Sequence, residues 1–346
     1  MGAIIFSSDV LKFDVTVGID QFSFQVKAGN RFCGVKNVPD GLHVIHISSS
    51  FNDDGIRYGY WFEASSGLYM RYDEESEMYQ MFREPDDIKY ERMLQMGNHL
   101  MVNYPRLDDT NWSELTRFIS YEQIETILDS NYVDSSMTAK EESRVLNKRL
   151  GTVNDSTCKH FKYTDIHFKS PSAIRPNHQM EDYMDKSYYL NHVIVNQQLN
   201  GHINRLLGEL QFAFCNAMLF ANYGSSLQWH SIIELISFSS KISHTFIEQF
   251  DKILALQLQT LPPEYAETLI NKELWERCLT KSHQNDKLKL TKKAYESKFD
   301  PDQENSECES LTTLETGTLP NIDSDYDDDI EENKPSVASS VYYIRP

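Results

Sequence analysis

The spacing of apolar side chains changes once along this 346-residue chain. In the first hundred residues, apolar side chains alternate with polar ones in short runs, as in Phe13, Val15 and Val17. In the second half, apolar side chains recur every three to four residues instead. Alternation is typical of half-buried strands, and the longer spacing is typical of helices. The sequence therefore predicts an α+β protein with a β-rich N-terminal domain and an all-helical C-terminal domain.

Turn residues divide the first part into predicted strands. Gly18-Ile-Asp20 separates the run at Phe13 from the run at Phe22 to Val26, and Val38-Pro-Asp-Gly41 is another turn. Further predicted strands are 42–48, 56–62, 68–72 and 77–82. Short strands rich in Tyr, Phe and Val at this spacing indicate an antiparallel β domain, which we place at residues 1–138. Two helices are expected to close it: one capped by Asp109 or Thr110 and carrying Leu115, Phe118 and Ile119, the other through Ile124, Ile127 and Leu128.

Polar residues predominate between the two halves. Ser170-Pro-Ser and Arg175-Pro-Asn are breaker sequences, and Lys140 to Leu150 predicts at most a marginal helix. We expect a polar linker at residues 139–185.

The second half predicts a helical domain at residues 186–298. Leu206 to Phe220 is apolar on nearly every face, which is typical of a buried central helix. Asn222-Tyr-Gly-Ser is expected to break the chain, and a helix resumes at Leu227 to Phe238. Thr245 with Glu248 predicts a capping box for the next helix. Pro262-Pro263 ends that helix, and Pro263 suits the first turn of the following one.

Negative charge is concentrated near the C-terminus. The net charge is −19, and residues 300–334 hold 13 acids and one base, a net of −12 that leaves −7 for the remainder. Low hydrophobicity with high charge predicts a disordered tail at residues 299–346. The acidic balance disfavours a general nucleic-acid or anionic-membrane binder. No apolar run reaches membrane-spanning length, no signal peptide is visible, and the five scattered cysteines indicate a reducing compartment.

Catalytic motifs are absent from the sequence. It has no Gly-Lys-Ser/Thr phosphate loop, no Gly-x-Ser-x-Gly elbow and no His-Glu-x-x-His. His43 and His46 lie three apart in a predicted strand, so their rings are expected on opposite faces and not around a metal. We expect no enzyme activity, no catalytic residue, no metal and no cofactor.

Three segments remain as candidate sites. Lys281 to Lys298 holds six lysines and two acids, which fits a local RNA contact or a solvated helix face. The C-terminal Val341, Tyr342, Tyr343 and Ile344 are strong strand formers, which either add to a partner's sheet edge or fold back on the chain's own β domain. The serines of Ser237-Phe-Ser239-Ser240-Lys-Ile-Ser243 either cap helices or form a phosphorylation switch.

Both halves resemble the A1-cistron splicing factor family. The motifs that carry the resemblance are Gly18-Ile-Asp20, Phe32-Cys-Gly-Val-Lys36, His43-Val-Ile-His46, Arg57-Tyr-Gly-Tyr-Trp-Phe62, Tyr132-Val-Asp-Ser-Ser-Met-Thr138, Ala173-Ile-Arg-Pro176, Met180-Glu-Asp182, Gly208-Glu-Leu-Gln-Phe-Ala-Phe214 and Asn222-Tyr-Gly-Ser-Ser-Leu-Gln-Trp-His230. They cover about residues 13–280.

The resemblance implies a non-enzymatic assembly factor of the U5 small nuclear ribonucleoprotein, cytoplasmic and nuclear. Such factors bind the RNase H-like and MPN (Jab)-like domains of the large central spliceosomal scaffold protein. They keep the U5 helicase and RNA off those domains until phosphorylation favours exchange. By the same resemblance, Val341 to Ile344 is the strand given to the partner, and the phosphorylated region falls at Ser239, beside Ser240. The alternative is an RNA-binding accessory protein that uses Lys281 to Lys298.

Overall fold

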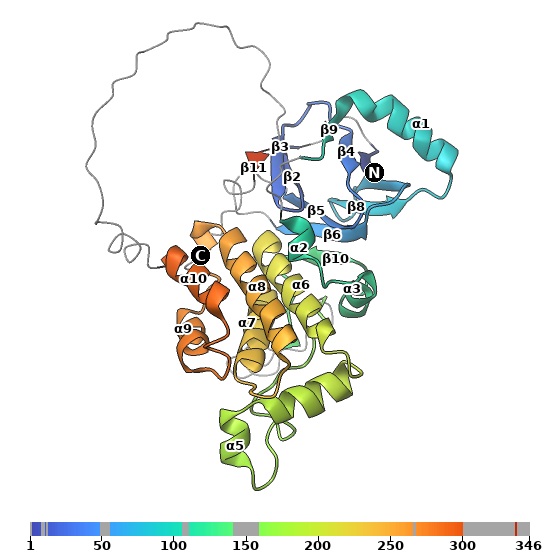
Figure 1. Cartoon of the computed structure of the whole chain (residues 1–346). Coiled ribbons are helices and arrows are strands. Elements are labelled where there is room, and N and C mark those ends of the chain that lie inside the picture. The colour runs from blue at the N-terminus through green and yellow to red at the C-terminus, as the bar shows by residue number, and fades with distance from the viewer. Residues whose placement is uncertain are drawn as a thin grey trace, which may run out of the picture.

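The computed structural model describes residues 2–7, 11, 13–48, 56–105, 111–140, 159–265, 268–299 and 336–337. It shows a β-rich N-terminal region with two sheets and a C-terminal helical region, as the change of spacing predicts (Figure 1). Within the described residues, no helix is both long and apolar enough to cross a membrane.

The six-stranded sheet is antiparallel throughout. Its order is β10-β6-β5-β2-β3-β11. The strands are β2 (Val15–Ile19), β3 (Phe22–Val26), β5 (Leu42–Ser48), β6 (Arg57–Glu63), β10 (Tyr132–Asp134) and β11 (Ser336–Val337). The predicted strands at 22–26, 42–48 and 56–62 therefore lie in this sheet.

The five-stranded sheet mixes strand directions. Its order is β8-β7-β1-β4-β9. The strands are β1 (Gly2–Phe6), β4 (Gly34–Val38), β7 (Leu68–Asp73), β8 (Met78–Arg83) and β9 (Met101–Asn103). The pairs β1–β4 and β7–β8 are antiparallel, as predicted for the β domain, whereas β1–β7 and β4–β9 are parallel. β1 escaped the sequence analysis because its buried run Ala-Ile-Ile-Phe does not alternate.

Short helices accompany the sheets. They are α1 (Asp87–Gly97), the 3₁₀ turn η1 (Asn98–Leu100), α2 (Trp112–Leu115) and α3 (Tyr121–Ile127). α3 matches the second predicted closing helix. α2 is shorter than the first one predicted: it ends at Leu115, before Phe118 and Ile119. The residue before α2 is Asn111, and the predicted caps Asp109 and Thr110 lie outside the described residues. α1 was not predicted, although Asp86 caps it by accepting from the Ile88 and Lys89 amides.

The helical region follows the predicted order with shifted boundaries. Its elements are α5 (Gln179–Met184), the π-helix η2 (Tyr189–Gln198), α6 (Asn204–Phe220), α7 (Tyr223–Ser237), α8 (His244–Thr260), the 3₁₀ turn η3 (Pro263–Tyr265), α9 (Lys272–Lys281) and α10 (Lys289–Phe299). The linker expected before them contributes buried Phe161, Tyr163 and Ile166. The tail around β11 and the expected helix after Lys140 lie outside the described residues.

Three helix starts differ from the prediction. α7 begins at Tyr223, because the Asn222 side chain accepts from the Ser225 amide at 2.7 Å and caps the helix. The cap of α8 is Ser243 and not Thr245. Pro263 starts only the single turn η3, and α9 begins nine residues after it at Lys272.

α6 is the structural centre that joins the two regions. Every residue from Leu206 to Phe220 is buried, and the main hydrophobic core contains apolar residues of both regions. The Trp61 indole of β6 donates to the Asn216 side chain at 2.9 Å. Gln211 accepts from the Phe118 amide at 2.8 Å and donates to the Glu114 carbonyl at 2.7 Å. Polar side chains of α6 thus bind the β-rich region through specific hydrogen bonds.

Candidate functional site

The predicted serines lie in the loop between α7 and α8. Ser239 is fully buried, and its hydroxyl donates to the Leu235 carbonyl at 2.7 Å. Its own carbonyl accepts from the Gln284 side chain at 2.5 Å. The Ser239 hydroxyl is therefore closed to a kinase in the folded protein.

Ser240, by contrast, is exposed and faces the carboxylate of Asp185. Its amide donates to Asp185 Oδ1 at 3.1 Å, and its hydroxyl donates to Oδ2. Ser187 donates to Oδ1 from both its amide, at 2.9 Å, and its hydroxyl, at 2.6 Å. Partial burial would raise the pKa of Asp185, but these hydrogen bonds outweigh it and lower the pKa to about 2. Asp185 is thus an ionised acceptor at neutral pH.

Two further hydrogen bonds join the same segments. The Lys241 amide donates to the Ser187 hydroxyl at 2.8 Å, and the Lys186 amide donates to the Phe238 carbonyl at 2.7 Å. We call Asp185, Ser187, Ser240 and Lys241 the Asp185 clasp. It fastens the chain between α5 and η2 to the loop between α7 and α8.

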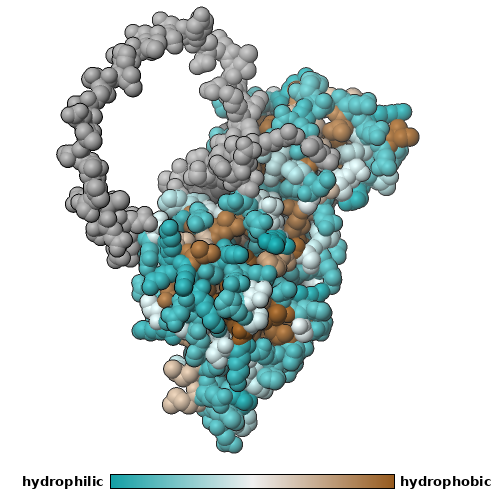
Figure 2. Space-filling model, in the orientation of Figure 1, coloured by the Kyte–Doolittle hydropathy of each residue, from teal (hydrophilic) through white to brown (hydrophobic). Residues whose placement is uncertain are grey.

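α5 places an exposed apolar stripe next to the clasp. Met180, Tyr183 and Met184 are 78%, 68% and 60% exposed, and their spacing puts them on one face. We call them the α5 patch. Apolar atoms protrude from the surface near α5 in Figure 2. Arg175 holds the helix from the other side with a 2.7 Å ion pair to buried Asp182. Exposed apolar groups in a fixed position are typical of a protein-binding surface.

The predicted terminal strand, Val341 to Ile344, lies outside the described residues. Just before it, β11 pairs antiparallel with β3, with Ser336 opposite Ser23 and Val337 opposite Phe22. Part of the C-terminal segment therefore lies on the chain's own six-stranded sheet.

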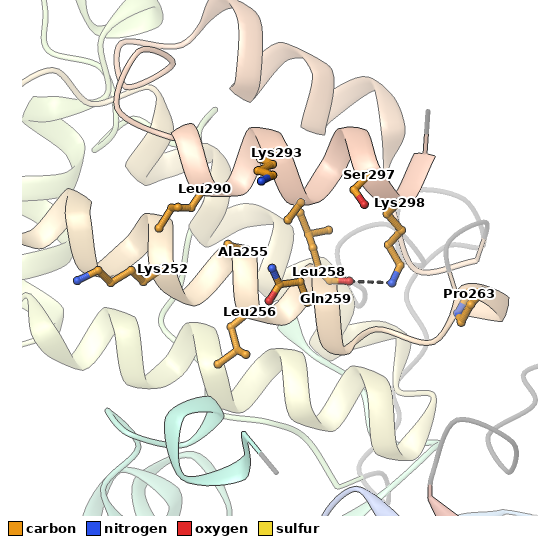
Figure 3. Close-up of a pocket in the computed structure, with 11 residues that line it drawn as sticks. Lys252, Ala255, Leu256, Leu258, Gln259, Pro263, Leu290, Lys293, Ser297 and Lys298 are labelled. Atoms are coloured by element: carbon orange, nitrogen blue, oxygen red, sulfur yellow. Dashed lines mark hydrogen bonds between the residues drawn. The ribbon is translucent and has the colours of Figure 1, made fainter. Parts of the chain in front are cut away.

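The lysine-rich segment forms one side of a groove between α8 and α10 (Figure 3). Its volume is about 840 Å³, with Ala255, Leu256 and Leu258 among its apolar lining. Lys298 donates to the Leu258 carbonyl at 2.7 Å and so satisfies a backbone acceptor in the last turn of α8. None of the lining residues is aromatic. Single-stranded RNA sites stack bases on aromatic rings, so the lining does not favour the RNA alternative.

The two histidines lie on opposite faces of β5, as expected. His43 packs against Tyr104, and His46 packs against Phe220 of α6. Burial lowers the pKa of His46 to about 3. No cluster of three or more metal-ligating side chains occurs among the residues that the structure describes.

Sequence analysis missed the partner that His43 and His46 share. Asp20 turns the chain between β2 and β3 with φ of +55°. Its carboxylate lies 2.6 Å from His43 Nδ1 and accepts from Tyr104 at 2.7 Å, and its carbonyl lies 3.0 Å from His46 Nε2. Burial would lower the pKa of His43, but the Asp20 charge and hydrogen bonds outweigh it and raise the pKa. These residues stand far apart in sequence with no spacing signal, and their buried bonds fix the core of the β-rich region.

Another buried carboxylate lies in α6. Glu209 is 2% exposed and accepts from the Thr164 amide, the Thr164 hydroxyl and the Gln228 side chain at 2.7–2.9 Å. Burial raises its pKa to about 7, because the three hydrogen bonds compensate only part of the desolvation. It ties the segment before α5 to α6 and α7.

The sequence matches two protein-family models. Residues 2–129 match the AAR2 N-terminal domain, and residues 163–316 match the AAR2 C-terminal repeat region. The chain is 40% identical to A1 cistron-splicing factor AAR2 of Saccharomyces cerevisiae, with 96% of this chain and 97% of the relative covered. It is 26% identical to Protein AAR2 homolog of Homo sapiens, over 74% of this chain and 75% of the relative. The corresponding protein of Caenorhabditis elegans is 23% identical over 74% and 78%.

Proposed function

Because the chain belongs to the AAR2 family of splicing factors, we propose that it is a non-enzymatic assembly factor of the U5 small nuclear ribonucleoprotein. The observation that carries the proposal is 40% identity over nearly the full length of both chains to a protein named A1 cistron-splicing factor. In this proposal the protein acts in the nucleus, as a splicing role implies, and also in the cytoplasm.

The partner in this proposal is the large central scaffold protein, through its RNase H-like and MPN-like domains. While bound, the chain keeps the U5 helicase and RNA from those domains. Val341, Tyr342, Tyr343 and Ile344 add as a strand to the partner's sheet, with backbone hydrogen bonds supplying affinity and alternate side chains supplying specificity.

The α5 patch gives the same partner a second contact. Met180 and Met184 have flexible apolar side chains that suit an interface, and Tyr183 adds a ring with a polar end. Its position depends on the Asp185 clasp, which holds the chain directly after α5. Loss of the clasp would therefore release one of the two contacts.

Phosphorylation of Ser240 provides that release. A phosphate carries about two negative charges. On Ser240 it would replace a hydroxyl that donates to the ionised Asp185 carboxylate, so attraction becomes repulsion. We favour Ser240 over Ser239 as the regulatory site, because the Ser239 hydroxyl is buried and already bonded.

Affinity capture from cell extract tests the assembly function. The full chain should retrieve the U5 scaffold without the helicase, and a truncation ending at Lys334 should retrieve much less. Equal retrieval would make the terminal strand dispensable, and no retrieval by either would contradict the assembly function.

Charge substitutions test the switch. Ser240→Glu should lower scaffold capture, whereas Ser240→Ala should lower it less, since it removes a bond without adding charge. Combining Ser240→Glu with Asp185→Asn should recover part of the capture, because the repulsion is removed. Purely additive losses in the double variant would show that Asp185 does not transmit the charge.

A further inference from the structure

The outer edge of β3 is built to accept a strand. β3 is paired to β2 along its length, and only the two residues of β11 cover its other side among the described residues. Its sequence, Phe-Ser-Phe-Gln-Val, contains no proline and no charge. Edge strands are normally protected by such residues, because unpaired backbone groups recruit other strands.

β11 identifies the segment that occupies this edge. Ser336 and Val337 pair antiparallel with Ser23 and Phe22, and Figure 1 shows β11 beside β3. The 36 residues between Phe299 and Ser336 span up to about 120 Å when extended, so the chain can reach its own sheet from the end of α10.

The register limits how much of the tail the edge can hold. Val337 pairs with Phe22, the first residue of β3, and the chain before Phe22 is the turn that Asp20 forms between β2 and β3. β3 therefore offers the tail no strand residue beyond Phe22 in this direction. On the other side, Pro335 has no amide hydrogen to donate, so the ladder loses one hydrogen bond there without a change of register.

We propose that the β3 edge docks the chain's own C-terminal segment at Ser336–Val337 and so presents Val341 to Ile344 at the end of the sheet. Docking shortens the tether of the terminal strand from more than forty residues to a few. A shorter tether confines the strand to a smaller volume and raises its effective concentration next to a bound partner. The docking stands on the described pairing, and the use of the presented strand rests on the proposed function.

Disulfide trapping tests the docking. Under the docking proposal, the register of Ser336 and Val337 continues to Lys334 and sets it opposite Gln25, which is exposed on β3. Gln25→Cys with Lys334→Cys should form a disulfide about tenfold faster than Gln25→Cys with Glu332→Cys, because directly opposed strand residues match disulfide geometry and positions two residues away do not. The two loops are almost equal in length, so chain entropy does not distinguish the pairs. Both variants carry Cys158→Ser and Cys308→Ser, since Cys33, Cys215 and Cys278 are buried.

The product must be a cross-linked monomer. Equal rates for both pairs would overturn the docking, and a cross-linked dimer would show that the edge takes the tail of a second copy instead. Hydrogen exchange on the full chain gives an independent measurement. Val337→Pro should speed amide exchange at Phe22 and Ser23, the residues of β3 that pair with β11, and unchanged exchange there would overturn the proposal.

Scaffold capture separates this inference from the proposed function. Under the docking proposal, Val337→Pro slows scaffold association severalfold but leaves the dissociation rate unchanged, because the presented strand itself is intact. Tyr343→Pro should instead speed dissociation and leave exchange at β3 unchanged. If Tyr343→Pro has no effect on capture while the disulfide forms in register, the docking stands and the strand-addition function fails.

Discussion

At the scale of single residues, the partly buried Asp185 and the buried Glu209 show how burial and neighbouring donors set the pKa of a carboxyl group. Asp185 accepts four hydrogen bonds and keeps a pKa of about 2. Glu209 accepts three in a deeper site, and its pKa rises to about 7. The sequence shows neither the lowered pKa of Asp185 nor the raised pKa of Glu209, because the fold brings the donors Thr164, Gln228 and Ser240 to these acids. The sequence shows several serines together at a break between helices, but it does not show that Ser239 is buried and Ser240 exposed.

Glu209 makes stability depend on pH. Its pKa is raised in the folded protein, so the native state holds a proton that the unfolded chain releases. Stability should therefore fall as pH rises from about 4.5 to about 7 and stay lower above that range. Glu209→Gln mimics the protonated acid and does not titrate. Between pH 5 and pH 8 the wild type should lose roughly 2–3 kcal/mol of unfolding free energy that the variant keeps. Urea unfolding at the two pH values measures this.

The exposed Glu91 supplies the control for that experiment. Glu91→Gln should leave the pH dependence of the wild type intact. A Glu209→Gln protein with the same pH dependence as the wild type would contradict the raised pKa.

At the scale of elements, apolar spacing predicted the strands at 22–26 and 42–48 and the buried helix α6, because each has a clear period. It missed β1, β4 and β9, whose runs are short or apolar without alternation, and whose pairing joins distant segments. The predicted first residue of a helix was wrong where more than one nearby residue could act as the cap. Asn222 caps α7, but Asn222-Tyr-Gly-Ser was interpreted as a break because these residues also favour turns.

α10 depends on a cap that comes from another helix. Asp251 of α8 accepts from the Leu290 amide at 3.1 Å and from the Thr291 amide at 2.8 Å. Asp251→Ala should therefore destabilise the protein by about 2 kcal/mol and speed amide exchange in Lys289–Phe299. Asp286 is acidic and nearer to α10 in sequence, but its carboxylate is not among the acceptors of these amides, so Asp286→Ala is the matched control. Equal effects of the two variants would refute the capping role.

At the scale of the whole molecule, the two regions share one core across α6. Trp61 of the β-rich region is fully buried, and it contacts Phe212 with ring centroids 5.1 Å apart. Gln211 satisfies two backbone groups of the β-rich region. Sequence predicted two domains from the change of period, but the bonds that join them depend on polar residues inside an apolar helix. Gln211 lies 93 residues from its partner Phe118, and Asn216 lies 155 residues from its partner Trp61.

Gln211 couples the unfolding of the two regions. Gln211→Leu preserves the approximate size but leaves the Phe118 amide and the Glu114 carbonyl without their partner. We expect a loss of about 2–4 kcal/mol and a broader or split thermal transition. Calorimetry measures both. A single transition of unchanged width and midpoint would show that the regions are joined by apolar contact alone.

The charge of the whole chain predicts salt-sensitive partner binding. In the proposed function the scaffold surface later meets RNA, so we expect it to be basic and to attract a protein of net charge −19 at long range. Scaffold affinity should fall on the order of tenfold between about 50 and 500 mM salt. Replacing the five aspartates of the run at 323–329 with asparagine should flatten that dependence. Equal affinity at both salt concentrations would remove electrostatics from the binding.

β6 packs against α6, but it is synthesised long before α6, so this part of the core forms late during translation. Trp61 leaves the ribosome 155 residues before Asn216, the acceptor of its indole hydrogen. At roughly 5–20 residues per second, the β-rich region waits about 10–30 s for the helix that covers it. A nascent chain of that length exposes the apolar face that Phe212 later contacts. The protein that we propose to shield another protein during its assembly therefore passes through a stage in which it needs shielding itself.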